Sequence, residues 1–281
     1  MASEHQLLRI ETDAGVAVVT IDAPPMNVMT ISLYLELAAA CADLEADDDV
    51  RVVVLRSADP DFFIAHFDVS AILQFPTDGP AVRDESLSAF HEMCERLRTM
   101  PKATIAELGG RVGGGGSELA SSCDMRFGAL GRTIVNQMEV PLGILPGGTG
   151  TQRLPRLLGR GRAMEVILGA IDLDAETAER WGYLNRALPP DELRPFVDAL
   201  ARRIAGFPAG AIARAKRAVA NADDVPLREG LIEEAFLFQE TLRDPEAQDA
   251  MRRFLDLGGQ TREPELRMGE LVTEVAERRR T

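Results

Sequence analysis

The chain has 281 residues, 46% of them apolar, which is enough for one sizeable core or for a core with a smaller helical appendage. Its 31 basic and 45 acidic residues give a net charge of -14, which argues against a nucleic-acid or anionic-membrane surface, although a local basic pocket could hold a phosphorylated cofactor. Three widely separated cysteines indicate neither a disulfide framework nor a zinc site. With no basic or apolar leader and no membrane-spanning window, we expect a cytoplasmic protein without nucleic-acid or membrane partners.

The first part of the chain alternates predicted strands and helices. Two β-rich runs joined by a turn at 12–15 predict a hairpin, and their ranges are Leu7–Glu11 and Val16–Ile21. A helix is expected from an N-cap at Thr30 to about Glu45, and the β-branched run Arg51–Arg56 predicts a strand buried on both sides. This order implies a right-handed crossover.

An aromatic loop, Ser57–Ile72, comes next, and it is either a hydrophobic plug under the core or part of a site. The segment Gln74–Arg83 contains several Pro and Gly residues and is the best candidate for a mobile segment that gives access to a site. A helix is expected at Ser86–Arg98.

Four consecutive glycines, Gly113–Gly116, lie between a predicted strand at Ala103–Leu108 and a predicted helix. Ordering four glycines is costly, so they are expected where the backbone must approach a ligand closely. Their N–H groups and the positive end of the helix suit an anion or a developing oxyanion. A flexible linker is the less favoured interpretation, because the run leads directly into an amphipathic segment that begins one position before Glu118.

Short strands expected at Cys123–Gly128 and Arg132–Val135 complete a repeated strand-strand-helix order. This order predicts a layered or coiled β/α arrangement more than a simple doubly wound sheet. A second informative stretch, residues 136–159, places Glu139 in apolar surroundings before a glycine-rich turn at Gly147–Gly150. Neither glycine cluster matches a dinucleotide fingerprint or a P-loop, so a nucleotide-phosphate cradle is disfavoured.

Glu118 and Glu139 each lie near a glycine-rich turn in low-polarity surroundings. Burial raises the pKa of a carboxyl group toward neutrality, so that one group can donate a proton while its ionised partner accepts one. Such a pair suits proton movement beside a carbonyl, and the alternative is two ordinary structural glutamates. His66 is the only histidine in a plausible site, but a lone loop histidine is more often a structural hydrogen-bonding group.

Nearly everything after Arg160 is predicted to be helical, and a composition shift near Gly206 separates a mainly helical region. An apolar stripe there that includes Leu231, Phe238 and Leu242 is expected to pack on the core or between subunits. The expected helices are Ala163–Leu168, Ala175–Trp181, Pro190–Gly206, Gly210–Ala222, Leu227–Leu242, Pro245–Leu257 and Glu263–Arg280.

Two long motifs, GGRVGGGGSELASSCDMRF and NQMEVPLGILPGGTGTQRLPRLLG, resemble those of the enoyl-CoA hydratase/isomerase (crotonase) superfamily. PPMNVMT and FFIAHFDVS stand where that family has two further loops, and the resemblance covers about Leu7 to Phe254. It implies an α/β fold, a spiral of β-β-α repeats over residues 1–206, with a C-terminal helical trimerisation region over 207–281. It also implies trimers or dimers of trimers that act on acyl-CoA thioesters in fatty acid metabolism, with no metal and no cofactor other than the coenzyme A thioester itself as substrate.

The resemblance also assigns roles to residues of this sequence. The backbone N–H groups of Phe67 and Gly115 match the two oxyanion-hole donors, which hold the thioester oxygen as enolate charge develops. Glu118 and Glu139 match two glutamates that hold a water for attack at C3, with Glu139 delivering the proton to C2. The residues implied to contact the coenzyme A part or the acyl group are Met26, Val28, Ala65, His66, Asp68, Gly114 and Leu142.

Three departures from the family pattern lie in the FFIAHFDVS loop. His66 replaces a glycine, so the loop cannot freely take a positive φ next to the donor at Phe67. The bulky Phe67 indicates a smaller or differently shaped acyl pocket, and Val69 and Ser70 stand where basic residues are usual. The resemblance favours an enoyl-CoA hydratase because isomerases of the family typically keep only the carboxylate at the Glu139 position. The alternatives are an enoyl-CoA isomerase or other enolate chemistry in the same pocket, and a non-catalytic acyl-CoA-binding scaffold.

Overall fold

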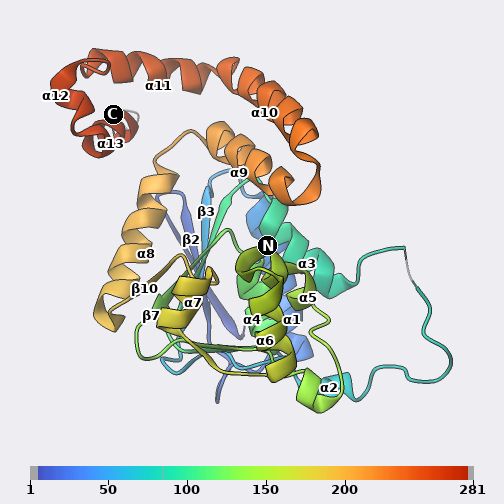
Figure 1. Ribbon diagram of the computed structural model, residues 1–281. Helices are drawn as coiled ribbons and strands as arrows, with labels where there is room; N and C mark the ends of the chain where they lie inside the picture. The colour runs from blue at the N-terminus through green and yellow to red at the C-terminus, as the bar shows by residue number, and fades with distance from the viewer. Residues whose placement is uncertain (1–5, 84, 278–281) are drawn as a thin grey trace.

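The computed structural model describes residues 6–83 and 85–277, and it contains two β-sheets with helices packed around them (Figure 1). The larger sheet has six strands in the order β1-β2-β3-β5-β7-β10, all parallel except for the β1–β2 hairpin. These strands are β1 Leu8–Asp13, β2 Val16–Ile21, β3 Val52–Ser57, β5 Ala103–Leu108, β7 Met125–Ala129 and β10 Arg186–Leu188.

The smaller sheet has four strands in the order β4-β6-β8-β9, of which β9 alone runs antiparallel to its neighbour. They are β4 Phe62–Ile64, β6 Arg111–Gly113, β8 Ile134–Asn136 and β9 Leu173–Asp174. From β3 to β8, successive strands belong in turn to the larger and to the smaller sheet. An α-helix follows each pair of strands, but after the last pair, β7 and β8, the short 3₁₀-helix η1 (Val140–Leu142) precedes the next α-helix. This alternation confirms the predicted coiled β/α arrangement.

Helix α1, Ile31–Ala46, begins where the sequence predicts, because the Thr30 side chain caps it by accepting a hydrogen bond from Leu33 N at 3.2 Å. Its predicted apolar face is buried in the main core with Val53 and Leu55 of β3, whereas Val52 and Val54 are buried on the other face of the sheet, so β3 is buried on both sides as predicted. The remaining helices of the body are α2 Val69–Ile72, α3 Ala89–Thr99, α4 Gly114–Ser121, the short 3₁₀-helix η1 Val140–Leu142, α5 Gly150–Leu158, α6 Arg160–Gly169, α7 Ala175–Trp181 and α8 Pro190–Ala205.

Helix α8 covers one face of the larger sheet through a second apolar cluster that includes Leu193, Val197 and Ala201. On the other face, the main core lies between the larger sheet and helices that include α1, α3 and α4. The two clusters place α4 in the middle of the molecule, and all eight of its residues are buried. The predicted segment Gln74–Arg83 is exposed, and residues 76–83 form neither helix nor strand.

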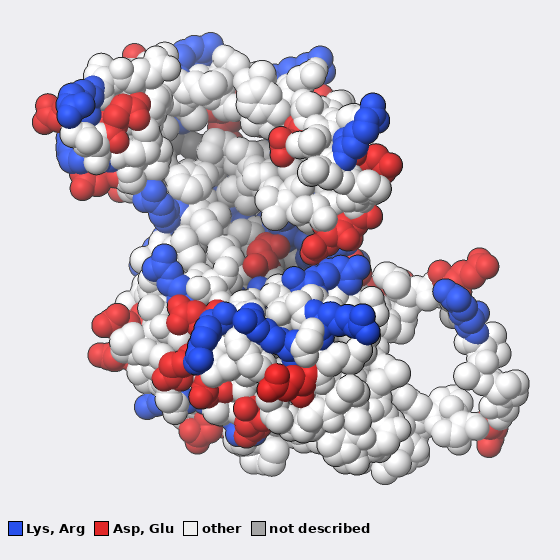
Figure 2. All heavy atoms as spheres, viewed as in Figure 1, with Lys and Arg blue, Asp and Glu red and all other residues white. Residues whose placement is uncertain are grey.

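Five C-terminal helices continue beyond the sheets, and α10 to α13 form an arm over one end of the body (Figure 1). Figure 2 shows that the surface is hollowed between this arm and the body. In the described chain, no helix combines the length and the apolar character needed to span a membrane. The bounds are α9 Ala209–Asp224, α10 Leu227–Leu242, α11 Pro245–Asp256, α12 Arg262–Glu265 and α13 Met268–Glu277.

One expectation for the arm needs correction, and one of the two alternatives for its apolar stripe, packing on the core or between subunits, is excluded. The predicted helix Glu263–Arg280 is two helices, α12 and α13, and its residues 278–280 lie outside the described residues. The apolar stripe of α10 does not pack on the core of its own chain, because Leu231 and Phe238 are 53% and 62% exposed.

The glycine run also differs from the prediction. Helix α4 begins at Gly114, so three of the four glycines lie inside the helix instead of preceding it, and Glu118 is its fifth residue. The first glycine, Gly113, ends the short strand β6, which the sequence did not predict. Packing explains this start, since a Cβ on Gly116 would lie only 2.6 Å from the carbonyl oxygen of Ile64 in β4. Glycine is therefore the residue that lets α4 lie this close to the smaller sheet.

Candidate active site

Glu118 lies in α4, is 4% exposed and points at the second glycine-rich turn. Its Oε1 accepts hydrogen bonds from the backbone N–H groups of Gly148 at 2.7 Å, Thr149 at 2.8 Å and Gly150 at 2.8 Å. These N–H groups belong to the start of α5, where the positive end of a helix favours a carboxylate. Within the described residues, the hydrogen bonds to this carboxylate all end on Oε1, so Oε2 is the oxygen left for a water or a proton.

Glu139 immediately precedes η1 and is 8% exposed. The pKa of its carboxyl group is raised to about 7, mainly by burial and to a smaller extent by the nearby charge of Glu118, against the lowering effect of backbone hydrogen bonds. At neutral pH both protonation states of Glu139 are therefore populated. This property suits a group that exchanges protons during a reaction.

The glycines bring the two carboxylates to one surface. A Cβ on Gly114 would lie 2.8 Å from Glu139 Oε1, and one on Gly148 would lie 2.5 Å from Glu118 Oε2. Neither glutamate forms an ion pair with any residue in the described ranges, which sets them apart from structural salt-bridged glutamates. The structure thus brings together the two glutamates that the sequence singled out.

Gly115 and Phe67 contact one another beside these carboxylates. A Cβ on Gly115 would lie 3.2 Å from Phe67 Cβ and 3.6 Å from Phe67 N. The N–H of Gly115 belongs to the first turn of α4 and has no acceptor within that helix.

The orientation of the Phe67 N–H follows from a parallel bridge between Phe67 and Met29. Met29 N donates to His66 O at 2.8 Å, and Asp68 N donates to Met29 O at 3.0 Å. Because the C=O and N–H of a trans peptide point in opposite directions, the Phe67 N–H points away from Met29. An oxyanion hole needs two such N–H groups on the same side, and Gly115 is the neighbour on this side.

Comparison with known proteins identifies the family to which the chain belongs. The sequence profile described as enoyl-CoA hydratase/isomerase matches residues 11–262. This chain belongs to the enoyl-CoA hydratase/isomerase family. It is 31% identical over 249 residues to the short-chain-enoyl-CoA hydratase of Clostridium acetobutylicum, covering 88% of this chain and 94% of that protein.

The solved structures of this family also show the fold. A crystal structure of an enoyl-CoA hydratase from Geobacillus kaustophilus matches with a TM-score of 0.82 at 29% identity, covering 90% of this chain and 95% of its own. A structure from Streptomyces avermitilis is 38% identical, covers 97% of this chain and 99% of its own, and has a TM-score of 0.70. The crotonase-type spiral predicted from the sequence is therefore confirmed.

His66 does not distort this crotonase-type loop in the way that the sequence suggested. The non-glycine residues with positive φ in the described chain are Ala14, Asn27, Ala170 and Gln260, so His66 keeps an ordinary negative φ. Its ring Nδ1 lies 2.8 Å from Phe67 O. Since a carbonyl oxygen only accepts, Nδ1 carries the hydrogen in this contact. The expected conflict between a histidine and a positive φ does not arise.

The residues expected at the coenzyme A end are only partly gathered together. Met26, Ala65 and His66 line a cavity of about 340 Å³ next to Gly113. The other four expected residues lie outside its lining, and one of them, Gly114, is the first residue of α4. Val28 is half-buried, Asp68 caps α2 by accepting a hydrogen bond from Ser70 N at 2.8 Å, and Leu142 is 50% exposed in η1.

An aromatic wall that the sequence did not single out lies between the two glycine clusters. The ring of Phe90 in α3 packs edge-on against Phe67 at 6.0 Å and stacks on Tyr34 at 6.0 Å. A Cβ on Gly148 would meet Phe90 at 2.5 Å. The side chain of Phe67 is thus held against this wall, and a differently shaped acyl pocket stays a prediction.

Two polar residues that support the site were also missed. Asn27 is buried, and its side chain accepts from Ala23 N at 2.7 Å and donates to Phe63 O at 3.0 Å, which ties the loop before Met29 to β4. Gln137 is fully buried beside Glu139, and one end of its side-chain amide lies 3.0 and 3.2 Å from the two carboxylate oxygens. The signal available in the sequence was a polar side chain two positions before a buried glutamate.

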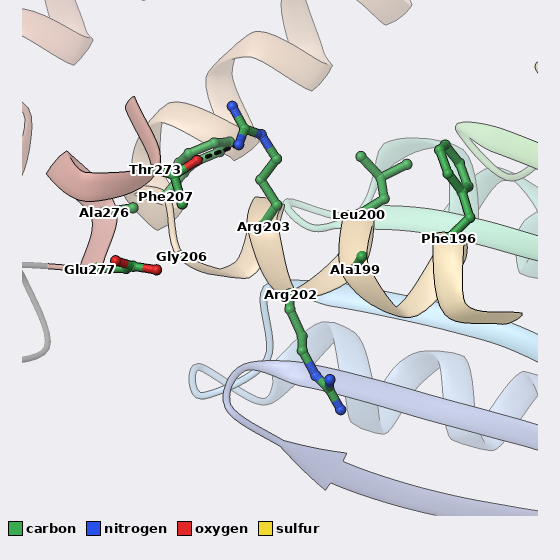
Figure 3. A pocket seen from close by; sticks show the side chains of 10 residues that line it. All are labelled: Phe196, Ala199, Leu200, Arg202, Arg203, Gly206, Phe207, Thr273, Ala276 and Glu277. Atoms are coloured by element: carbon green, nitrogen blue, oxygen red, sulfur yellow. Dashed lines mark hydrogen bonds between the residues drawn. The ribbon is translucent and has the colours of Figure 1, made fainter. Parts of the chain in front are cut away.

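Larger cavities lie elsewhere. One of about 490 Å³ separates α8 from α13, and there Arg203 reaches across to a hydrogen bond with Thr273 (Figure 3). Another, of about 810 Å³, lies under α9. Neither is lined by Glu118 or Glu139, and both accompany the packing of the C-terminal helices on the body.

Proposed function

We propose that this protein is an enoyl-CoA hydratase, which adds water to the C2–C3 double bond of a 2-enoyl-CoA and yields the 3-hydroxyacyl-CoA. The observation that carries the proposal is the pair of buried carboxylates, without ion-pair partners among the described residues, beside two N–H groups from different elements. Glu118 has one oxygen locked by three N–H donors, and Glu139 has a pKa of about 7. Having two carboxylates favours hydration over isomerisation, because hydration needs one group to take a proton from the water and another to give one to carbon, whereas a single carboxylate can carry the proton from one carbon to the other in isomerisation.

The proposed reaction begins at the thioester carbonyl. The N–H groups of Phe67 and Gly115 receive its oxygen and stabilise the enolate, each contributing a few kcal/mol. Oε2 of Glu118 takes a proton from the water as the water oxygen bonds to C3. Glu139 gives its proton to C2, and the electron pair returns from the enolate oxygen to form the new C–H bond. The glutamates finish with the proton on Glu118, and exchange with solvent restores the starting state.

The coenzyme A thioester is the substrate in this proposal, and no metal or separate cofactor takes part. The part of the substrate beyond the thioester is assigned to the cavity beside Met26, Ala65 and His66. The relatives are named enoyl-CoA hydratases, which supports a place in fatty acid metabolism. Three unpaired, buried cysteines fit a cytoplasmic location.

The test is the loss of the conjugated thioester absorbance with a panel of 2-enoyl-CoAs of increasing chain length. Glu118→Gln and Glu139→Gln should each lower kcat by at least about a hundredfold, because proton transfer by a positioned group typically contributes that much. Circular dichroism of both variants checks that they fold. No turnover at any chain length, or wild-type rates from both variants, would reject the proposal.

Product analysis separates the alternatives. Turnover of a 3-enoyl-CoA to the 2-enoyl-CoA without uptake of water oxygen identifies an isomerase. Tight binding of coenzyme A thioesters without any chemical change identifies a scaffold protein.

The exposed apolar face of α10 supports a further part of the proposal, a homotrimer or a dimer of trimers. Light scattering of the purified protein should give three or six times the chain mass of 30.6 kDa. Aspartate at both Leu231 and Phe238 should reduce this mass. A wild-type monomer would contradict the assembly without affecting the proposed reaction.

A further inference from the structure

A line of buried polar side chains leads away from Glu139 into the protein interior. Gln137 lies 3.0 and 3.2 Å from the two oxygens of the carboxylate, and the other end of its amide lies 3.1 Å from Ser117 Oγ. Ser117 Oγ in turn lies 3.0 Å from the hydroxyl of Tyr183. Gln137, Ser117 and Tyr183 are all 0% exposed, so water does not compete for these contacts.

The chemistry of the partners fixes the direction of each hydrogen bond. The carboxylate accepts, so the amide nitrogen of Gln137 must face Glu139 and its oxygen must face Ser117. Ser117 must then donate to that oxygen, which leaves its own Oγ as an acceptor. Burial raises the pKa of Tyr183 to about 12, so the phenol keeps its hydrogen and can donate to Ser117. The hydrogen bonds of Ser117 and Tyr183 thus orient the amide nitrogen of Gln137 toward Glu139.

The far end of this line is firmly anchored. Tyr183 follows Gly182, which ends α7 in the left-handed conformation, and Tyr183 N donates to Ala178 O at 2.8 Å. The backbone oxygen of Tyr183 accepts from Arg126 Nε at 2.7 Å, and the same guanidinium lies 5.9 Å from the centre of the tyrosine ring. Among the described residues, the hydrogen bonds of this buried phenol go only to the two oxygens of Ser117, at 3.0 and 3.2 Å.

We infer that Ser117 and Tyr183 are positioning residues that act through Gln137 to keep an N–H donor on Glu139. The expected effect on catalysis rests on the proposed function, whereas the expected effect on the pKa of Glu139 does not. Without the Tyr183 hydroxyl, Ser117 is free to donate to a carbonyl in the preceding turn of its own helix. The Gln137 amide then loses its fixed orientation, and its oxygen can turn toward the carboxylate. That change removes a donor from the ionised form of Glu139.

The expected effect of Tyr183→Phe has a definite sign. Loss of an N–H donor to an anion disfavours the anion, so the pKa of Glu139 should rise, by roughly one unit for a hydrogen bond of ordinary strength. The alkaline limb of the pH profile of kcat/KM should move to higher pH by the same amount. Below pH 7, where Glu139 is largely protonated in both proteins, the variant should also have a lower kcat because a weaker acid gives up its proton more slowly, and KM should change little because the substrate contacts are untouched.

Two comparisons separate positioning from a general loss of packing. Ser117→Ala removes the hydrogen bond to Gln137 directly and should raise the pKa of Glu139 by the same amount. Adding Tyr183→Phe to this variant should then change that pKa no further. Ser121→Ala is the matched control, because it removes a buried hydroxyl one turn further along α4 that bonds the main-chain oxygen of Glu118 and does not face Gln137. It should leave the titration of Glu139 unchanged.

The decisive measurement is the titration of Glu139 by NMR with ¹³C-labelled glutamate, where the resonance is identified by its absence in Glu139→Gln. This readout needs no turnover, so it decides the inference even where every enoyl-CoA fails as a substrate. An unchanged titration in both Ser117→Ala and Tyr183→Phe overturns it. A shift from Tyr183→Phe that persists undiminished in the Ser117→Ala background also overturns it. If Tyr183→Phe does not fold, the difference in Glu139 titration between Ser117→Ala and Ser121→Ala decides the inference, and equal titrations overturn it.

Discussion

Replacement of Gly114 by alanine tests whether the glycine run serves the chemistry. Gly114 has φ +44°, so an alanine there takes a left-handed conformation at a cost of about 1–2 kcal/mol. Its Cβ would lie 2.8 Å from Glu139 Oε1, whereas ordinary contact begins at 3.4 Å, so the carboxylate must retreat by about 0.6 Å, the difference of the two. Since a 1 Å displacement of a reacting group can cost about a hundredfold in rate, kcat should fall roughly tenfold.

Gly131→Ala is the matched control for this variant. Gly131 also has a positive φ, +69°, but a Cβ there would have open space around it. Both variants should lose a similar few degrees in melting temperature, while only Gly114→Ala loses activity in the enoyl-CoA absorbance assay. Wild-type kcat in Gly114→Ala, or an equal loss of kcat in Gly131→Ala, would refute the reasoning.

Three further predictions concern titration, an ion pair and the thiols. Because the folded protein holds the Glu139 proton up to a pKa of about 7, kcat/KM should fall as the pH rises through 7, and the free energy of unfolding should decrease as the pH rises from about 4.5 to 7. Urea titrations should show that Glu139→Gln removes this decrease. Glu107→Ala removes the 2.8 Å partner of the buried Arg56 and leaves Asp198 as its remaining partner, so urea unfolding should show a loss somewhat below the roughly 3–5 kcal/mol typical of a buried charge left entirely unpaired. Thiol reagents should label the folded protein slowly and the urea-unfolded protein fully, because burial raises the pKa of all three thiols, Cys41, Cys94 and Cys123.

Each of these predictions has its own control. A kcat/KM that stays constant across neutral pH contradicts the role given to Glu139. Glu11→Ala removes an exposed partner of Arg9 and should cost less than about 1 kcal/mol, so an equal loss from the exposed and buried pairs contradicts the second prediction. Labelling of the folded protein as fast as that of the unfolded protein contradicts the third.

The longer elements were predictable because their signals are local. Strands β2 and β5 and helices α7 and α10 have the ends that the sequence indicated. Apolar periodicity and flanking prolines mark such elements. Strands of two or three residues, such as β6 and β9, form by pairing with strands that are distant in the sequence. So short a segment contains no pattern from which this pairing could be predicted.

The start of α4 shows tertiary packing overriding local propensity. Glycine is a poor helix former, so the prediction placed the glycines before the helix. In the structure, the closeness of α4 to β4 excludes any side chain at Gly116, and burial of the whole helix compensates for the low propensity. The same limit applies to the line from Glu139 to Tyr183. Its members come from positions up to 66 residues apart, so no window of sequence contains their relationship.

The loop around His66 shows why its departures from the family pattern leave the donor geometry intact. The donor at residue 67 is a backbone N–H, and its direction is set by the bridge to Met29, which involves main-chain atoms only. The φ of His66 is not positive, so its side chain does not meet the strain of a left-handed conformation at this point. The side chain of Phe67, by contrast, lies against Phe90, where it shapes the space beside Gly115. In the proposed reaction, a substitution in this loop therefore changes the shape of the acyl pocket while the main chain keeps the N–H groups in place, so that the choice of acyl group is separate from the stabilisation of the enolate.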